Sequence, residues 1–264
     1  MKFTLALKQN KNALISLGLS IAGFLFLWLV WIIAYYAVRN ELLFASVGDT
    51  FSALAKLLFT GGALARSFWQ SFGETFLRTL VAFIISCVCG IGFASLAVSF
   101  RGVRAFLAPV ISVLRTLPTL AITLFLILWA GKSFAPVLVA VFVLFPAVYA
   151  AALASFTDAV TRFSDFAKAY KIGRAKRIFS LYLPVSLPAL LTEGGGILSM
   201  GLKITVSGEV LAATAQSLGG MMQEAKMFLN MPTLMALTLL SVLVGFLLEG
   251  LGLLCYRLAV RWRR

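Results

Sequence analysis

The chain has 264 residues, of which 61% are hydrophobic and 12% charged, and its formal net charge is +14. Soluble domains are typically about 45–50% apolar and about 25% charged, so this composition excludes an ordinary soluble domain, and it equally excludes a disordered chain. The absence of histidine from the sequence excludes Ser/His/Asp and Cys/His catalytic arrangements and most zinc sites.

Six apolar segments are candidates for membrane-spanning helices, each of which needs about 20 apolar residues. The first follows three lysines but exceeds the roughly 7–15 apolar residues of a signal peptide, so we expect it to be retained. The third is interrupted by Arg115. In chain order the segments are 13–38, 79–100, 105–131, 133–157, 186–208 and 227–248.

Two shorter features lie in and between these spans. Residues 39–75 are too polar to cross a membrane, and within them 51–61 predicts a short amphipathic helix on the outer surface. In the second span Ser86, Gly90 and Ala94 recur at a spacing of four, which favours close approach by another helix.

The distribution of basic residues predicts the orientation. With six spans and a cytoplasmic N-terminus, fifteen basic residues fall on the cytoplasmic side and five on the outer side. Cytoplasmic loops of membrane proteins carry an excess of Lys and Arg, so we expect both termini in the cytoplasm. Together with the six spans, this predicts an all-α, multi-pass membrane protein.

The longest predicted cytoplasmic loop, 158–185, contains six basic residues. Ser164 is a candidate N-cap for a short helix, and Gly173 is a candidate for the left-handed residue that ends it. A second short helix over 174–181 then leads to Pro184. A basic hairpin lying on anionic headgroups is the alternative interpretation.

This loop resembles the cytoplasmic loop of ABC importer permeases, in which Glu-Ala-Ala-x-x-x-Gly precedes a Leu-Pro that enters the next span. Ala169 and Gly173 match that motif, whereas Ala167 and Lys168 stand where the family has Glu and Ala. In the family this short helix docks into a cleft of the ATP-hydrolysing subunit.

Other segments resemble the nitrate/sulfonate/taurine type of these permeases. Residues 115–121, Arg-Thr-Leu-Pro-Thr-Leu-Ala, followed by Trp129 and Gly131, are similar to the third-span signature. Residues 71–78 resemble the entry into the core, and Glu209 with 218–220 resembles the segment after the fifth span. The matches cover about residues 71–256.

The resemblance implies an inner-membrane permease of the type I ABC importer fold, with a first helix and external segment at 1–70, a five-helix core at 71–256 and a basic tail at 257–264. Two ATPase subunits would dock at loop 162–184, an external binding protein would deliver a small oxyanion, sulfonate or vitamin precursor-like solute, and a second permease copy would complete the path. The residues implied in coupling are Ala167, Lys168, Ala169, Lys171, Gly173, Arg174 and Pro184. The sequence lacks a Gly-x-x-x-x-Gly-Lys-Ser/Thr motif, so we expect ATP and Mg²⁺ on the partner ATPase, no cofactor or metal on this chain, no enzyme activity and no nucleic-acid partner.

Polar groups within spans are costly in lipid and are therefore candidates for the translocation pathway. Arg115 is expected near the cytoplasmic end of its span, and Glu209 near the outer end of the fifth, where it lines an outer gate or sits at the interface. Pro118 is expected to kink the third span. Hydrogen bonds between helices are the alternative role for the hydroxyl groups. The pathway candidates are Arg115, Pro118, Thr119, Thr123, Thr205, Ser207 and Glu209.

Two other functions are weighed against the importer. An ion- or proton-coupled secondary transporter would need acidic or histidine relays near the middle of the membrane, and the chain has no histidine and few acids there. A membrane enzyme would need a convergent catalytic cluster, whereas the nine acidic residues are scattered along the sequence.

Overall fold

The computed structural model describes the backbone of residues 2–40, 42–59 and 63–261, with side chains except those of 2–17, 63–66, 174, 175 and 261. The described chain is helical and without strands, as the long apolar segments predicted. Its elements are α1 (Lys2–Val38), α2 (Val47–Phe59), α3 (Ala63–Ser99), α4 (Arg101–Thr116), α5 (Thr119–Ala169), α6 (Arg174–Arg177), the π-helix η1 (Ile178–Tyr182), α7 (Leu183–Ala212), α8 (Leu218–Met227) and α9 (Met231–Arg261).

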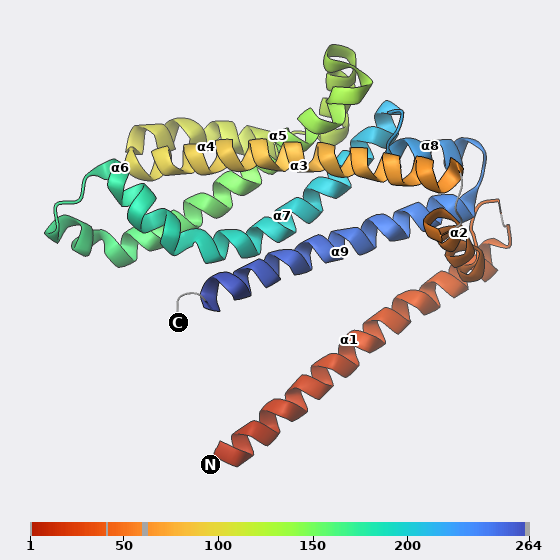
Figure 1. Ribbon diagram of the computed structural model, residues 1–264, viewed down its shortest axis with the longest axis horizontal. Helices are drawn as coiled ribbons and strands as arrows, with labels where there is room; N and C mark the ends of the chain where they lie inside the picture. The colour runs from red at the N-terminus through yellow and green to blue at the C-terminus, as the bar shows by residue number, and fades with distance from the viewer. Residues whose placement is uncertain (1, 41, 60–62, 262–264) are drawn as a thin grey trace.

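Four long helices form the core. Figure 1 shows α3, α5, α7 and α9 running along the long axis of the molecule, and each packs on the next, α3 on α5, α5 on α7 and α7 on α9. The α5–α6 turn lies at the left-hand end of that view, and α8 lies at the right-hand end. The two ends of the core are therefore built from different segments of the chain.

Within the described residues, five segments are long and apolar enough to cross a membrane: 18–38, 67–99, 119–169, 178–212 and 231–260. Five of the six predicted spans fall largely in these helices, which mostly extend beyond the predicted bounds, although the last one begins at Met231 rather than at 227. The predicted third span is the exception, because it is not a single helix. Our count of six spans and the cytoplasmic placement of the termini remain predictions.

The third span breaks at Leu117 and Pro118. Helix α4 ends at Thr116, and both following residues have extended backbone, with ψ of 128° and 114°. Proline disfavours the helical conformation in the residue before it, which accounts for the ending of α4. A second interruption follows at Gly131, whose φ of 77° separates 119–130 from the rest of α5. Pro118 therefore separates two helices, where we expected a kink in one.

Small residues let the core helices approach closely. An added Cβ on Gly90 would lie 2.7 Å from Val148 of α5, which confirms the close approach predicted from the 86–90–94 spacing. Between α7 and α9, a Cβ on Gly195 would lie 2.8 Å from the Cα of Gly252. The backbones of these two helices meet at that point, and a larger side chain at either glycine would push them apart.

The two N-terminal helices differ in how they meet the core. Helix α1 diverges from the bundle in Figure 1, and the described indole of Trp31 donates a hydrogen bond to the carbonyl of Ala45 at 3.3 Å. Helix α2 is the amphipathic helix predicted over 51–61. It begins earlier than predicted, at Val47, and buries Leu54 and Leu57 in the cluster formed with α3, α7, α8 and α9.

Candidate functional sites at the two ends of the core

The first candidate site is the 162–184 loop, and its shape differs from the prediction. Helix α5 continues to Ala169, so Ser164 lies inside a helix and is not an N-cap. From Lys132 to Ala169 this helix would be about 57 Å long at 1.5 Å per residue, well beyond the roughly 30 Å hydrocarbon thickness of a bilayer. This part of α5 is therefore longer than one membrane crossing needs.

The turn after α5 is closed by backbone hydrogen bonds rather than by a left-handed glycine. The N–H of Ile172 donates to the carbonyl of Ala167 at 3.1 Å, and the N–H of Lys171 donates to that of Lys168 at 3.0 Å. This is the Schellman pattern, in which one residue adopts the left-handed conformation. That residue is Lys171, with φ of 47°, and not Gly173 as predicted.

Arg177 holds the turn against the following segment. Its Nε donates to the carbonyl of Ile172 at 2.6 Å, and its Nη2 donates to that of Ala167 at 3.4 Å. Residues 174–182 then run through α6 and η1 directly into α7, with Pro184 in the first turn of that helix. The predicted second short helix, 174–181, is thus continuous with α7.

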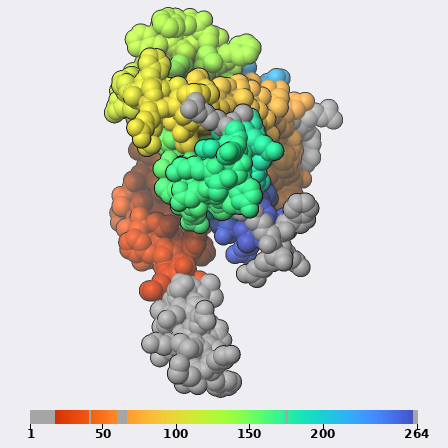
Figure 2. Space-filling model, turned by 90° about the vertical axis from the view of Figure 1, so that its left-hand side faces the viewer, coloured from red at the N-terminus to blue at the C-terminus, as the bar shows by residue number. Residues whose placement is uncertain are grey.

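The loop presents most of the predicted coupling residues to solvent. Lys168, Ala169, Lys171, Gly173 and Pro184 are exposed, whereas Ala167 is fully buried. Lys168 forms an exposed pair with Asp165 at 3.3 Å. The side chain of Arg174 lies outside the described residues. Figure 2 views the molecule from this end, with the green-to-teal chain of the loop region facing the reader.

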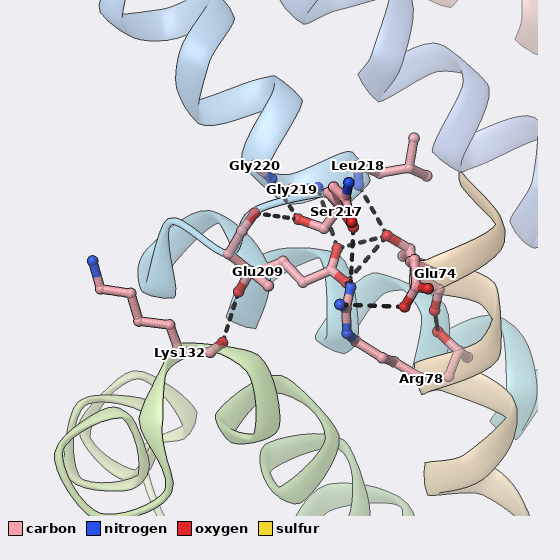
Figure 3. A network of polar contacts seen from close by, with 12 residues as sticks. Glu74, Arg78, Lys132, Glu209, Ser217, Leu218, Gly219 and Gly220 are labelled. Atoms are coloured by element: carbon pink, nitrogen blue, oxygen red, sulfur yellow. Dashed lines mark hydrogen bonds and ion pairs between the residues drawn. The ribbon is translucent and has the colours of Figure 1, made fainter. Parts of the chain in front are cut away.

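The second candidate site surrounds Glu209, at the opposite end of the core (Figure 3). The carboxylate is fully buried and accepts hydrogen bonds from Thr75 Oγ1 at 2.8 and 3.1 Å, from Arg78 Nη1 at 3.0 Å and from the N–H of Gly219 at 3.2 Å. These partners belong to α3 and α8, so the carboxylate of α7 joins three helices.

Two residues of α3 extend this network. Thr75 Oγ1 also accepts a hydrogen bond from the N–H of Leu218 at 2.9 Å, which supplies one of the amide partners missing at the start of α8. Arg78, with a side chain 15% exposed, pairs with the half-exposed Glu74 at 3.5 Å as well as with Glu209. A buried charge is tolerated only when it is paired with an opposite charge and its hydrogen-bonding atoms have partners. The Glu209 carboxylate meets both requirements.

The connection between α7 and α8 belongs to the same arrangement. Ser217 Oγ caps α8 by accepting from the N–H of Gly220 at 2.8 Å. Thr214 Oγ1 donates to the carbonyl of Lys132 on α5 at 2.8 Å. The segment after α7 is therefore tied to α5 as well as to α3, and in this conformation Glu209 is enclosed rather than lining an open path.

The other pathway candidates do not gather at one place. Arg115 Nη2 donates to the carbonyl of Pro146 at 3.2 Å, while Pro118 and Thr119 are exposed at the break after α4. The buried hydroxyl of Thr123 donates within its own helix, to the carbonyl of Thr119. Their role in a pathway remains a prediction.

Thr205 and Ser207 lie on opposite sides of α7. Ser207 is exposed, and its hydroxyl donates to the carbonyl of Lys203 at 2.8 Å. Thr205 is fully buried, and its hydroxyl is the described buried side-chain atom without a hydrogen-bond partner. These two residues therefore do not face a common space.

Sequence reasoning named Glu209 but missed its partners. Glu74 and Arg78 are four residues apart, a spacing that predicts a pair within one helix, yet nothing in the sequence connects them to a residue 131 positions later. Thr75 gave no signal, because a threonine in an apolar helix commonly bonds to its own backbone.

The sequence matches one protein family over residues 82–261, described as the binding-protein-dependent transport system inner membrane component. The taurine transport system permease protein TauC of Escherichia coli (strain K12) is 26% identical over 245 residues, which are 92% of this chain and 87% of that protein. The putative aliphatic sulfonates transport permease protein SsuC of Bacillus subtilis (strain 168) is 25% identical over 191 residues, which are 70% of this chain and 67% of that protein.

The fold is also similar to a solved structure. A chain of the MetNI methionine ABC transporter, in an inward-facing conformation, superposes with a TM-score of 0.60 at 17% sequence identity. The match covers 74% of this chain and 95% of that one. At this level of identity the likeness concerns the fold.

Proposed function

This chain belongs to the family of binding-protein-dependent transport system inner membrane components, and from that premise we propose that its 162–184 loop receives a separate ATPase subunit that drives import of a small anionic solute. The chain is a multi-pass inner-membrane permease of an ABC importer, not an enzyme. This family assignment argues against the secondary transporter considered above.

The observation that carries the proposal is the mechanical continuity of the loop with two core helices. Helix α5 enters the loop without a break, and α6, η1 and α7 leave it as one continuous path. Arg177 holds the turn between them through two backbone carbonyls. A displacement imposed on the loop would therefore reach both α5 and α7, as alternating access requires.

The remaining parts of the proposal follow from the family. ATP and Mg²⁺ would be bound by the ATPase, a second permease copy would complete the path, and an external binding protein would deliver the solute. Two relatives are named for taurine and for aliphatic sulfonates, so a sulfonate or a similar oxyanion is the solute class we propose for this chain.

Gly173 offers a direct test of docking. A Cβ added there would meet nothing within 4 Å, and among the described glycines it is Gly131 that has positive φ. Gly173→Trp should therefore leave this chain folded while obstructing a partner. We expect the variant to lose co-purification of the ATPase and solute uptake, with an unchanged detergent elution profile.

Gly102→Trp is the matched control. Gly102 is exposed in the first turn of helix α4, is predicted on the same side of the membrane, and an added Cβ there would also meet nothing within 4 Å. It should retain both the ATPase and uptake. If Gly173→Trp keeps normal co-purification and uptake, the ATPase does not dock at this loop.

A further inference from the structure

A pocket lies between α4 and α5, and among its lining residues only Arg115 is one of the pathway candidates named above. It has a volume of about 410 Å³, and its polar lining groups are Arg104 and Arg115 of α4 with Tyr149 and Thr157 of α5. The rest of the lining consists of Ile, Leu and Ala side chains of the same two helices. The size is within the range of small-molecule sites, about 300–1,000 Å³.

Helix periodicity explains why both arginines face this pocket. Residues 104, 111 and 115 are spaced by seven and four, so they share one face of α4, and Ile111 on that face is buried. The other side of α4 carries Phe106 and Val113, which are 72% and 57% exposed. The arginines therefore lie on the face of α4 that meets α5, where they line the pocket and remain exposed, whereas Phe106 and Val113 are turned away from α5.

The two guanidinium groups are not neutralised within the pocket. None of the described side chains that line it is a carboxylate. Asp158 follows Thr157 in the chain, but it pairs with Arg162 at 3.0 Å. Arg115 uses one N–H for the carbonyl of Pro146, and a guanidinium carries five such donors.

A guanidinium matches the paired oxygens of an oxyanion in geometry and charge. Both arginines are exposed, and a neutral solute would offer them no charged partner. We infer that this pocket binds the oxyanion group, such as a sulfonate, of the transported solute, an assignment that rests on the proposed importer function.

The pocket's extent favours a transported solute over a lipid phosphate, which has the same chemistry. Arg104 and Arg115 are eleven residues apart, about 16 Å along a helix. The pocket thus extends along most of α4, from its first turn to its last. A lipid phosphate stays at the headgroup level, where basic pockets commonly hold it.

Ala154 allows a test that does not depend on uptake. It is exposed, small and part of the lining. In full-length protein with Cys87, Cys89 and Cys255 replaced by serine, Ala154→Cys provides one thiol, whose reaction with anionic and cationic methanethiosulfonates of similar size can be timed. We expect the anionic reagent to gain about tenfold from the local positive field.

Variants then assign that preference to the arginines. R104Q/R115Q should abolish the preference, R104K/R115K should retain it, and Arg101→Gln, an exposed arginine at the same end that does not line the pocket, should leave it unchanged. A preference that survives R104Q/R115Q, or is absent from the parent protein, overturns the proposal.

Adding free sulfonates or an anionic lipid distinguishes a transported solute from a lipid phosphate as the bound oxyanion. In nanodiscs of phosphatidylcholine, taurine or methanesulfonate should slow modification of the Ala154→Cys thiol. If neither slows it, or if phosphatidylglycerol in the nanodisc slows it and the two sulfonates do not, the proposal is overturned.

The proposed function is tested separately, by measuring ATPase co-purification with the wild-type chain and sulfonate uptake by it. R104Q/R115Q should bind the ATPase normally and lose sulfonate uptake. If it retains both, the solute site is wrong while the importer assignment stands. If wild-type chain binds no ATPase, the importer mechanism fails while the thiol measurements still report anion binding.

Discussion

The two ends of the core hold their charged side chains in different ways. At the α8 end, Glu209 is fully buried, and its ion-pair partner Arg78, which lies 131 positions away in the sequence, is 15% exposed. At the α5–α6 end, Asp158 pairs with Arg162 and Asp165 with Lys168, over three or four residues, and the side chains are 59–95% exposed.

The buried charges at the α8 end join helices, whereas the exposed charges at the α5–α6 end remain accessible to solvent. The Glu209 network links α3, α7 and α8 and satisfies amide groups at the start of α8. The exposed pairs lie within the last turns of one helix and link no others. The α8 end is therefore built for rigidity, and the α5–α6 end has the accessible surface that a protein partner requires.

Removing the buried carboxylate should have the largest effect. Glu209→Leu leaves Arg78 mostly buried without its main partner, and breaking such a pair typically costs about 3–5 kcal/mol. We expect a loss of this size in the free energy of unfolding, measured by titration with SDS in mixed micelles. A loss below about 1 kcal/mol, the range of exposed pairs, would remove the distinction between the two ends.

Glycines at the two ends give a second comparison. An added Cβ on Gly219 would meet the Cβ of Glu209 and lie 2.6 Å from backbone atoms of Val206 and Val210, whereas one on Gly173 meets nothing. Gly219→Ala should cost about 1–3 kcal/mol through overpacking. Gly173→Ala should be nearly neutral in the same unfolding assay, and equal losses would contradict the packing described here.

Arg177 tests how firmly the α5–α6 turn is held. Arg177→Met removes its hydrogen bonds to Ile172 and Ala167, and hydrogen bonds of charged groups contribute about 1.5–3 kcal/mol each at most, less here because Arg177 is half-buried. We expect a local effect of about 1 kcal/mol, seen as faster tryptic cleavage at Lys171 with unchanged global unfolding. Unchanged cleavage would show that the Schellman turn alone keeps the loop closed.

The smallest effect should come from an exposed pair. Asp158→Asn removes the partner of Arg162 on the surface of α5, and exposed pairs contribute about 0.2–1 kcal/mol. Its unfolding free energy should lie within that margin of the parent protein at low salt and coincide with it at high salt, where screening is stronger. A larger, salt-independent loss would mean that the pair contributes to packing.

Much of the helical layout was predictable from local sequence. Hydropathy located five of the membrane helices, because a helix in lipid is a long run of apolar residues. Amphipathic spacing located α2, because packing one face on a core places apolar residues at helical intervals. The helix ends were less predictable. Helix α5 continues past Asp158 to Ala169 because polar residues are compatible with a helix that leaves the membrane, so hydropathy does not mark its end.

In the 162–184 loop, too, the position of a helix end could not be predicted from local sequence. A Gly after a basic helix predicts a left-handed terminus at Gly173, yet Lys171 adopts that conformation. The terminus depends on which backbone carbonyls remain free at the end of α5, and on Arg177 reaching back to them. Neither condition is local to the glycine.

Composition and hydropathy were sufficient to predict a helical membrane protein, because a bilayer requires long apolar helices. The motifs were sufficient to predict the family of importer permeases to which the chain belongs. Only the tertiary structure decided that Glu209 is enclosed by Thr75, Arg78 and Gly219, and that Arg104 and Arg115 line one pocket. The Glu209 contacts join residues on three different helices, and the pocket forms only where α5 packs against the face of α4 that carries both arginines. Both depend on how the helices pack, which no local pattern of residues specifies.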